Sequence, residues 1–177
     1  MFIESFIAGK YVNLRSVTVN DAAFILQIRN NPEISRFLPP LKVTIEQQQQ
    51  WIEKQRNDND SYYFLMEDKD GNPIGTTSVY DIKNGDAETG RLCSLGAPSS
   101  NVEACMMLHD FCFNIIGLTT LHIWVYEDNK PVINLNHSLG YEWIGRKTDE
   151  EGKAYKVGSM TRDQYEQKRE RLQRLIG

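Results

Sequence analysis

The residues best suited to chemistry form a strand, a loop and a helix near the middle of the chain. A strand is expected at residues 88–95, and a loop of small residues at 96–101 leads from it into a long apolar helix at 102–116. A turn of this kind presents unpaired backbone N–H groups and the positive end of a helix dipole, an arrangement that binds phosphates. This stretch therefore predicts a site for a phosphate-bearing cofactor.

Composition narrows the classes of protein and partner. The chain has 177 residues, which suits a single domain over residues 1–177. Its 20 basic and 24 acidic residues give a net charge of −4 without a basic cluster, which disfavours nucleic acid as a partner. Three cysteines without a C-x-x-C pair argue against a disulfide framework and favour a cytoplasmic protein. No apolar run approaches the roughly 18 residues that a membrane span needs.

Local patterns predict the elements that must position the central stretch. Thr18 with Asp21, Thr44 with Gln47 and Thr161 with Gln164 match capping boxes, and they predict helices at 19–29, 45–56 and from 162 onward. Strands are expected at residues 11–16, 62–67, 73–82, 88–95, 119–126, 141–145 and 155–160. The order indicates a mixed α/β fold in which helices cover a largely antiparallel sheet of about seven strands.

Four short motifs in this order resemble the GNAT acetyltransferase superfamily, whose members acetylate amines with acetyl-CoA. They are Ala87-Glu88-Thr89-Gly90, Asn101-Val102-Glu103-Ala104, Val125-Tyr126-Glu127-Asp128-Asn129 and Leu139-Gly140-Tyr141. The resemblance also covers residues 12–15 and Gly75, so it spans nearly the whole chain. Within the superfamily, the chain is similar to the branches that contain ribosomal-protein N-terminal acetyltransferases and amino-sugar acetyltransferases.

The resemblance implies that the fourth and fifth strands, residues 88–95 and 119–126, splay apart and hold acetyl-CoA between them. Its pantetheine would pair with the backbone at Leu92, Cys93, Ser94 and Leu95. Its pyrophosphate would lie on the backbone N–H groups of Gly96, Ser99, Ser100, Asn101 and Val102, with Asn129 helping to hold the cofactor. The family loop carries glycine or alanine where this chain has Ser99 and Asn101, which predicts altered cofactor affinity.

The resemblance also suggests catalytic roles. An ammonium acceptor must lose a proton before it attacks a thioester, and Glu88 is the expected base, directly or through water. A backbone N–H near residues 93–95 would stabilise the oxyanion. The tyrosine that serves many relatives as general acid is replaced by Asn136, which cannot supply a proton, and His137 beside it is the other candidate. Glu88 at the edge of a turn and His137 at a helix end could equally be structural.

The acceptor side is expected to involve Arg29, Asn30, Trp51 and Tyr80. Arg29 could pair with a diphosphate, and Trp51 or Tyr80 could stack on a base or sugar. Arg29 could instead close its helix, and Trp51 could lie in the core. The acceptor would be an amino sugar nucleotide or a peptide N-terminus, and a second copy of the chain is a further candidate partner. No residue spacing indicates a metal. The alternative is a GNAT-like domain with impaired catalysis that acts as an acyl-CoA sensor or binding module.

Overall fold

The computed structural model describes residues 1–177 and contains one eight-stranded sheet in the order β1-β2-β3-β4-β5-β6-β8-β7. The strands are β1 (Ile7–Ala8), β2 (Asn13–Ser16), β3 (Tyr62–Glu67), β4 (Pro73–Lys83), β5 (Asp86–Ser94), β6 (Thr120–Tyr126), β7 (Glu142–Thr148) and β8 (Ala154–Thr161). The helices are α1 (Ala22–Arg29), α2 (Ile45–Asn57), α3 (Pro98–Asp110), α4 (Lys130–Leu139) and α5 (Arg162–Ile176). All neighbours pair antiparallel except β5 and β6. The mixed, largely antiparallel fold is confirmed, with β1 as a strand beyond the seven expected.

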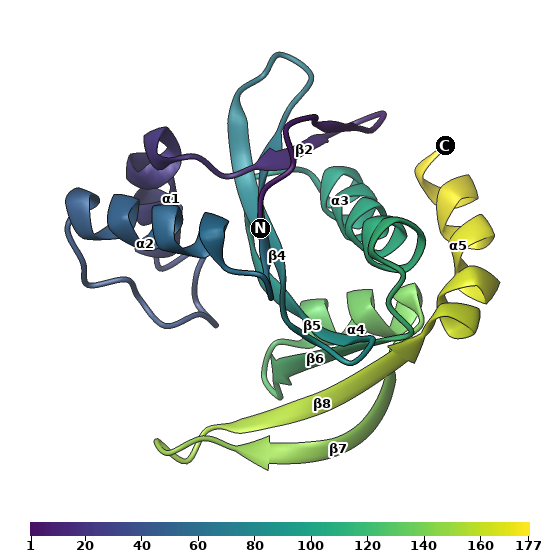
Figure 1. The fold of residues 1–177 in the computed structure, drawn as a ribbon. Helices are drawn as coiled ribbons and strands as arrows, with labels where there is room; N and C mark the ends of the chain where they lie inside the picture. The colour runs from purple at the N-terminus through teal and green to yellow at the C-terminus, as the bar shows by residue number, and fades with distance from the viewer.

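Helices cover both faces of the sheet. Figure 1 shows α1 and α2 on one side of the strands β2 to β4, and α3 and α5 on the other side. The larger hydrophobic core lies between the sheet and the helices α3, α4 and α5, and it includes Leu14, Leu121 and Met160. The smaller core lies under α1 and α2, around Ile25 and Ile52. None of these helices combines the length and hydropathy that a membrane crossing requires.

The capping boxes place the helices that the sequence predicts. The Thr44 hydroxyl accepts from the Gln47 N–H at 3.2 Å, while the Gln47 side chain accepts from the Thr44 N–H at 2.9 Å. Thr161 and Gln164 make the same exchange at the start of α5. Near Thr18 the chain first makes a short 3₁₀ turn, Val19–Asp21, before α1 begins. The cap chemistry is therefore a reliable marker of helix starts in this chain.

The helix α3 begins earlier than predicted. It starts at Pro98, whereas the small residues before Val102 indicated a loop. Proline is favoured at the first helical position because its ring fixes a helical φ and its missing N–H has no intrahelical partner there. The helix continues into a π-helical segment, Phe111–Ile116, and ends at Gly117 with a φ of 79°. The expected site loop is therefore shorter, and most of it forms the first helical turn.

The strands β5 and β6 run parallel and pair over only three positions. Asp86, Ala87 and Glu88 lie opposite Thr120, Leu121 and His122, and no pairing follows beyond them. Each strand keeps a partner on its other edge, β4 for β5 and β8 for β6. The expected splay of these two central strands is confirmed.

Candidate active site

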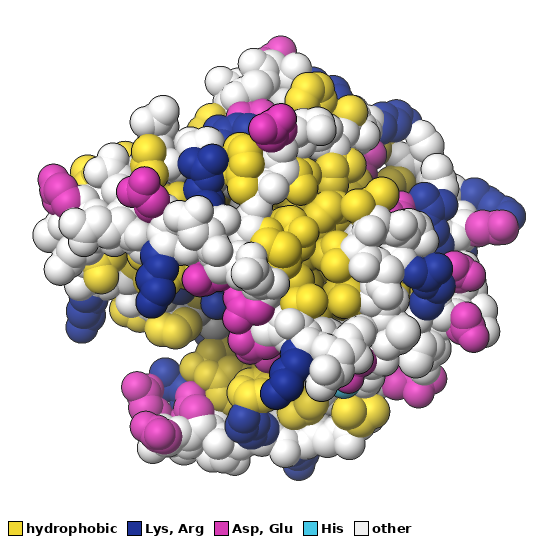
Figure 2. Space-filling view, viewed as in Figure 1, with side chains coloured by type: hydrophobic (Ala, Val, Ile, Leu, Met, Phe, Trp, Pro, Cys, Tyr) yellow, Lys and Arg dark blue, Asp and Glu magenta, His cyan; other side chains and the backbone are white.

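A cleft opens between β5 and β6 where their pairing ends. It has a volume of about 490 Å³, and residues of β5, β6, β8, α3, α4 and the segment after α1 line it. Figure 2 shows the surface hollowed between the lobe that carries β7 and β8 and the part that carries α1 and α2. Because β5 and β6 no longer pair here, backbone groups on their facing edges are free to bind a ligand.

Three residues expected from the sequence line this cleft: Leu92 on β5, Asn129, and Asn136 on α4. Asn129 also caps α4, because its Oδ1 accepts from the Val132 N–H at 3.4 Å. The other expected cofactor residues lie outside the cleft lining, at the end of β5 and in the first turn of α3: Cys93, Ser94, Leu95, Gly96, Ser99, Ser100, Asn101 and Val102. These residues follow directly after the part of β5 that lines the cleft.

The first turn of α3 offers a small anion-binding surface. Pro98 has no N–H, so Ser99 and Ser100 supply the leading backbone donors of the helix. The Asn101 side chain folds back and donates from Nδ2 to the Gly96 carbonyl at 3.3 Å. Neither Ser99 nor Asn101 has a positive φ. The lack of glycine at these two positions therefore causes no backbone strain. Its effect on phosphate binding comes from the space that the Ser99 and Asn101 side chains take.

Two residues at the end of β5 already have partners. The Cys93 Sγ lies on the α1 side, 3.3 Å from the Ser35 Oγ and 3.6 Å from the Ile28 carbonyl oxygen. Burial raises the pKa of the Cys93 thiol above its ordinary value. The Leu95 N–H donates to the Ile74 carbonyl at 2.7 Å. The expectation of a free oxyanion donor is therefore wrong at Leu95.

Glu88 occupies the last position at which β5 and β6 pair. It is half-buried, lies opposite His122, and accepts a hydrogen bond of 2.6 Å from the Tyr80 hydroxyl on β4. Burial raises the pKa of the Glu88 carboxyl above its ordinary value, and the bond from Tyr80 opposes that rise. A carboxyl with a raised pKa is better matched to accepting a proton near neutral pH.

A second cavity of about 230 Å³ lies between α2 and β4 and is lined by Trp51, Tyr80 and Arg91, among others. Trp51 is 40% exposed and meets Tyr63 edge-on, with ring centroids 5.7 Å apart, so it is not a core residue. The Arg91 guanidinium lies over the Tyr80 ring at 4.2 Å and lines both cavities. Arg91 was not expected from the sequence, and one face of Tyr80 is already covered.

Arg29 and Asn30 hold the segment that follows α1. Arg29 is buried, and its Nη2 donates to the Pro39 carbonyl at 2.8 Å. The Asn30 side chain donates to the Leu41 carbonyl at 3.0 Å and accepts from the Leu41 N–H at 2.9 Å. Neither side chain lines the cleft, whereas Phe37 within the held segment does.

Comparison with known proteins agrees with this architecture. A family model described as an acetyltransferase (GNAT) domain matches residues 12–142. The chain belongs to the GNAT acetyltransferase family. The acetyltransferase PseH of Campylobacter jejuni is 24% identical over 136 residues, which cover 75% of this chain and 86% of PseH. The protein is therefore an N-acetyltransferase by family.

Solved structures of other GNAT proteins share the fold. FdhC, described as a nucleotide-linked sugar GNAT, has a TM-score of 0.84 and 23% identity, covering 99% of this chain and 100% of FdhC. A spermidine N-acetyltransferase from Vibrio cholerae, solved with CoA and spermine, has a TM-score of 0.78 and 20% identity. That alignment covers 89% of this chain and 99% of the Vibrio protein.

The two residues considered as the general acid of this GNAT protein lie on different faces of α4. Asn136 is buried at the cleft, and its Nδ2 donates to the Val132 carbonyl at 2.8 Å. His137 is exposed and does not line the cleft. Successive residues of a helix point about 100° apart, so both side chains cannot face one site. Asn136 therefore has the better position but lacks an acidic proton.

A buried polar chain behind the cleft of this GNAT protein was not expected. The Tyr141 hydroxyl lies 2.6 Å from the Thr89 Oγ1 and 3.4 Å from the His109 Nε2. Thr89 and His109 also line the cleft. Burial lowers the pKa of His109 to about 3, so the imidazole is neutral at physiological pH. These groups add a buried polar patch to a cleft wall that also carries Arg91, Asn129 and Asn136.

Proposed function

We propose that the protein transfers an acetyl group from acetyl-CoA directly to a primary amine on an amino sugar nucleotide. The observation that carries this proposal is the splay of β5 and β6, which leaves unpaired backbone edges along a cleft of about 490 Å³ beside a helix N-terminus. The description of FdhC as a nucleotide-linked sugar GNAT supports this acceptor class. A peptide N-terminus is the second acceptor, because the sequence motifs are also similar to the peptide-modifying branch.

The residues present fit acetyl-CoA. The facing edges of β5 and β6 offer N–H and C=O groups to the amides of pantetheine, with Leu92 and Asn129 at the wall. The N–H groups of Ser99 and Ser100 at the positive end of α3 suit the pyrophosphate. When bound, acetyl-CoA supplies the acetyl group as an activated thioester.

Glu88 takes the proton of the acceptor ammonium, directly or through one water. Glu88 lies at the last paired position of β5 and β6 and lines neither cavity, but its carboxylate accepts from the Tyr80 hydroxyl, and Tyr80 lines the cavity that Trp51 also lines. The base is active when ionised, so turnover rises as the pH increases through the raised pKa of Glu88. Because N–H groups alternate in direction along a strand and the Leu95 N–H points to β4, the N–H of Ser94 is the proposed oxyanion donor.

Two measurements test the function. Acetyl-CoA should raise the melting temperature, and release of free thiol should follow when a panel of an amino sugar nucleotide, a peptide and spermidine is added. If acetyl-CoA does not raise the melting temperature, the proposed acetyltransferase function is refuted. Stabilisation without turnover on any amine would instead support an acyl-CoA sensor or binding module.

The base is tested by Glu88→Gln. This variant should lower turnover at pH 7 by roughly 10²–10⁴-fold while acetyl-CoA still shifts the melting temperature. Unchanged turnover would dismiss Glu88 as the base and leave the proposed transfer reaction standing.

A further inference from the structure

Tyr80 and Glu88 form a pair across the antiparallel strands β4 and β5. They lie opposite each other in the register, and the Tyr80 hydroxyl donates to the Glu88 Oε1 at 2.6 Å. A hydrogen bond of this length to a carboxylate is charge-assisted and restricts the orientation of the acceptor. Glu88 accepts from no other side chain.

The surroundings of Tyr80 restrict its ring and its hydroxyl. The Arg91 guanidinium lies 4.2 Å from the ring centroid and covers one face. Arg91 has a φ of 55°, and the β4–β5 register shifts between Thr76 and Ser78, so a bulge directs this side chain back over Tyr80. Gly90 leaves room for the hydroxyl, because a Cβ there would lie 3.1 Å from the Tyr80 oxygen.

We propose that Tyr80 is a positioning residue that holds the Glu88 carboxylate in its working orientation, with Arg91 fixing the Tyr80 ring. The inference rests on the proposed role of Glu88 as the base. It assigns Tyr80 a function through its hydroxyl instead of stacking on the acceptor.

Burial has the largest influence on the pKa of Glu88, and the bond from Tyr80 is the strongest of the interactions that oppose it. Burial raises the pKa of Glu88, the Tyr80 bond lowers it, Asp81 raises it, and Arg91 and Lys147 lower it. Burial and the contact with Glu88 also raise the pKa of the Tyr80 hydroxyl well above its ordinary value. Tyr80 therefore remains a protonated donor throughout the working pH range.

Two further titratable groups face Glu88 from its own strand and from β6. His122 lies opposite Glu88 in the parallel register, and its Nε2 is 3.7 Å from the Asp86 carboxylate. The pair of His122 and Asp86 is present in every variant of Tyr80, so its contribution to a pH profile cancels when the variants are compared.

The test is the pH dependence of kcat/KM for acetyl transfer, measured for the wild type, Tyr80→Phe, Glu88→Gln and the double variant. Tyr80→Phe removes only the donor, so the midpoint of the acidic limb should rise by about one pH unit, and kcat/KM at pH values well below the wild-type midpoint should fall roughly tenfold. In the Glu88→Gln background the same change should alter turnover by less than about twofold, because Tyr80 acts through Glu88. Tyr62→Phe is the matched control: Tyr62 packs against Phe111 on the α3 side and makes no hydrogen bond through its hydroxyl.

The outcomes separate the inference from the proposed function. If Glu88→Gln removes the acidic limb while Tyr80→Phe leaves the midpoint unmoved, the positioning role is refuted and Glu88 remains the base. If Glu88→Gln retains the acidic limb, the base assignment itself fails. An equal loss at every pH in Tyr80→Phe, also present in the double variant, would show that Tyr80 acts only through stability or acceptor binding.

Discussion

Glu103 should be one of the largest single contributors to stability in this protein. Its side chain is 7% exposed on α3, and its carboxylate accepts three backbone hydrogen bonds from the turn between β1 and β2. The Lys10 N–H donates to Oε1 at 2.7 Å, and the Tyr11 and Val12 N–H groups donate to Oε2 at 2.6 and 2.9 Å. Gly9 permits this approach, because a Cβ there would lie 2.7 Å from the Glu103 Oε2.

The magnitude for Glu103→Gln follows from these three bonds. A charge-assisted hydrogen bond contributes about 1.5–3 kcal/mol and a neutral one about 0.5–1.5 kcal/mol. The glutamine amide keeps one acceptor oxygen, which can retain the two bonds from Tyr11 and Val12 as neutral hydrogen bonds. Its NH₂ group would face the Lys10 N–H, so the third hydrogen bond is lost. The sum is a loss of about 3.5–6 kcal/mol, which corresponds to roughly 10–20 °C in melting temperature for a chain of this size.

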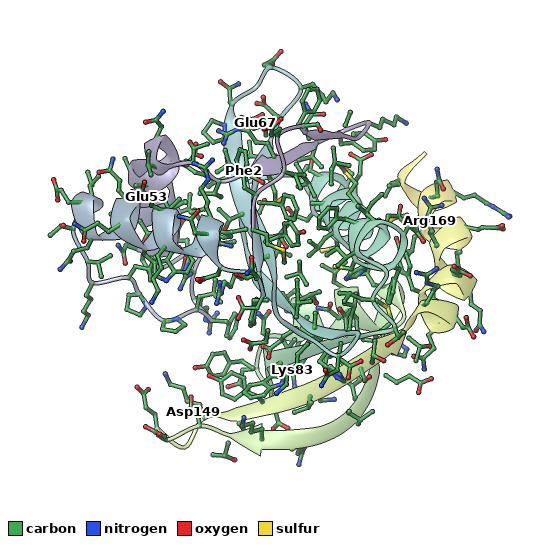
Figure 3. The ribbon with its side chains drawn as sticks, in the orientation of Figure 1. Phe2, Glu53, Glu67, Lys83, Asp149 and Arg169 are labelled. Atoms are coloured by element: carbon green, nitrogen blue, oxygen red, sulfur yellow. The ribbon has the colours of Figure 1, made fainter.

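Urea denaturation followed by circular dichroism measures this loss as a change in the free energy of unfolding. Glu53→Gln on α2 is the matched control, since Glu53 is exposed on the outer helix layer (Figure 3) and should change stability by less than about 0.5 kcal/mol. A loss below about 1 kcal/mol in Glu103→Gln would show that water replaces the carboxylate at these N–H groups, and the reasoning would be wrong.

Two further substitutions test the sheet and its N-terminal helix layer. Gly75→Ala should destabilise the protein by about 1–3 kcal/mol in thermal denaturation, because the new Cβ would lie 2.7 Å from the Cys93 carbonyl oxygen and force β4 and β5 apart; a neutral result would mean that the strands yield freely. Burial opposes ionisation of Asp21, but the Arg15 guanidinium and the Thr18 N–H outweigh it and lower the pKa of that carboxyl. The stabilisation is therefore present above an unfolded-state pKa of about 3.9 and is lost as the pH falls through the lower folded-state pKa. Asp21→Asn should cost about 2 kcal/mol at pH 7 and progressively less as the pH falls through the folded-state pKa, and a loss independent of pH would argue against the ion pair.

Local chemistry predicted the elements whose determinants lie within a few residues. Thr44 and Thr161 mark helix starts because the cap and its partner are three residues apart. The start of α3 was misplaced because Pro98 and its neighbours have a loop composition, although proline at the first helical position was the available signal. The short strand β1 had no local signal, since Glu103 holds the turn beside it from more than ninety residues away.

The sequence predicted those residues of the candidate site whose place follows from their position along a strand or helix. Leu92, Asn129 and Asn136 were expected from the resemblance to the GNAT family, and all three line the cleft. Arg91 could not be assigned in this way, because its left-handed φ and its place over Tyr80 depend on a register shift between two strands. A charged residue within a strand pattern otherwise indicates a solvent-exposed position.

The short pairing of β5 and β6 also affects how the protein behaves when its cleft is empty. Open strand edges recruit other extended chains and promote aggregation, and proteins usually shield them with charges, bulges or covering elements. Here the two edges lie inside a groove walled by α3, α4 and the segment after α1, and the bulge at Arg91 distorts one of them. If acetyl-CoA binds between β5 and β6 as proposed, it also covers these strand edges, and the protein should remain monodisperse longer at high concentration when acetyl-CoA is present.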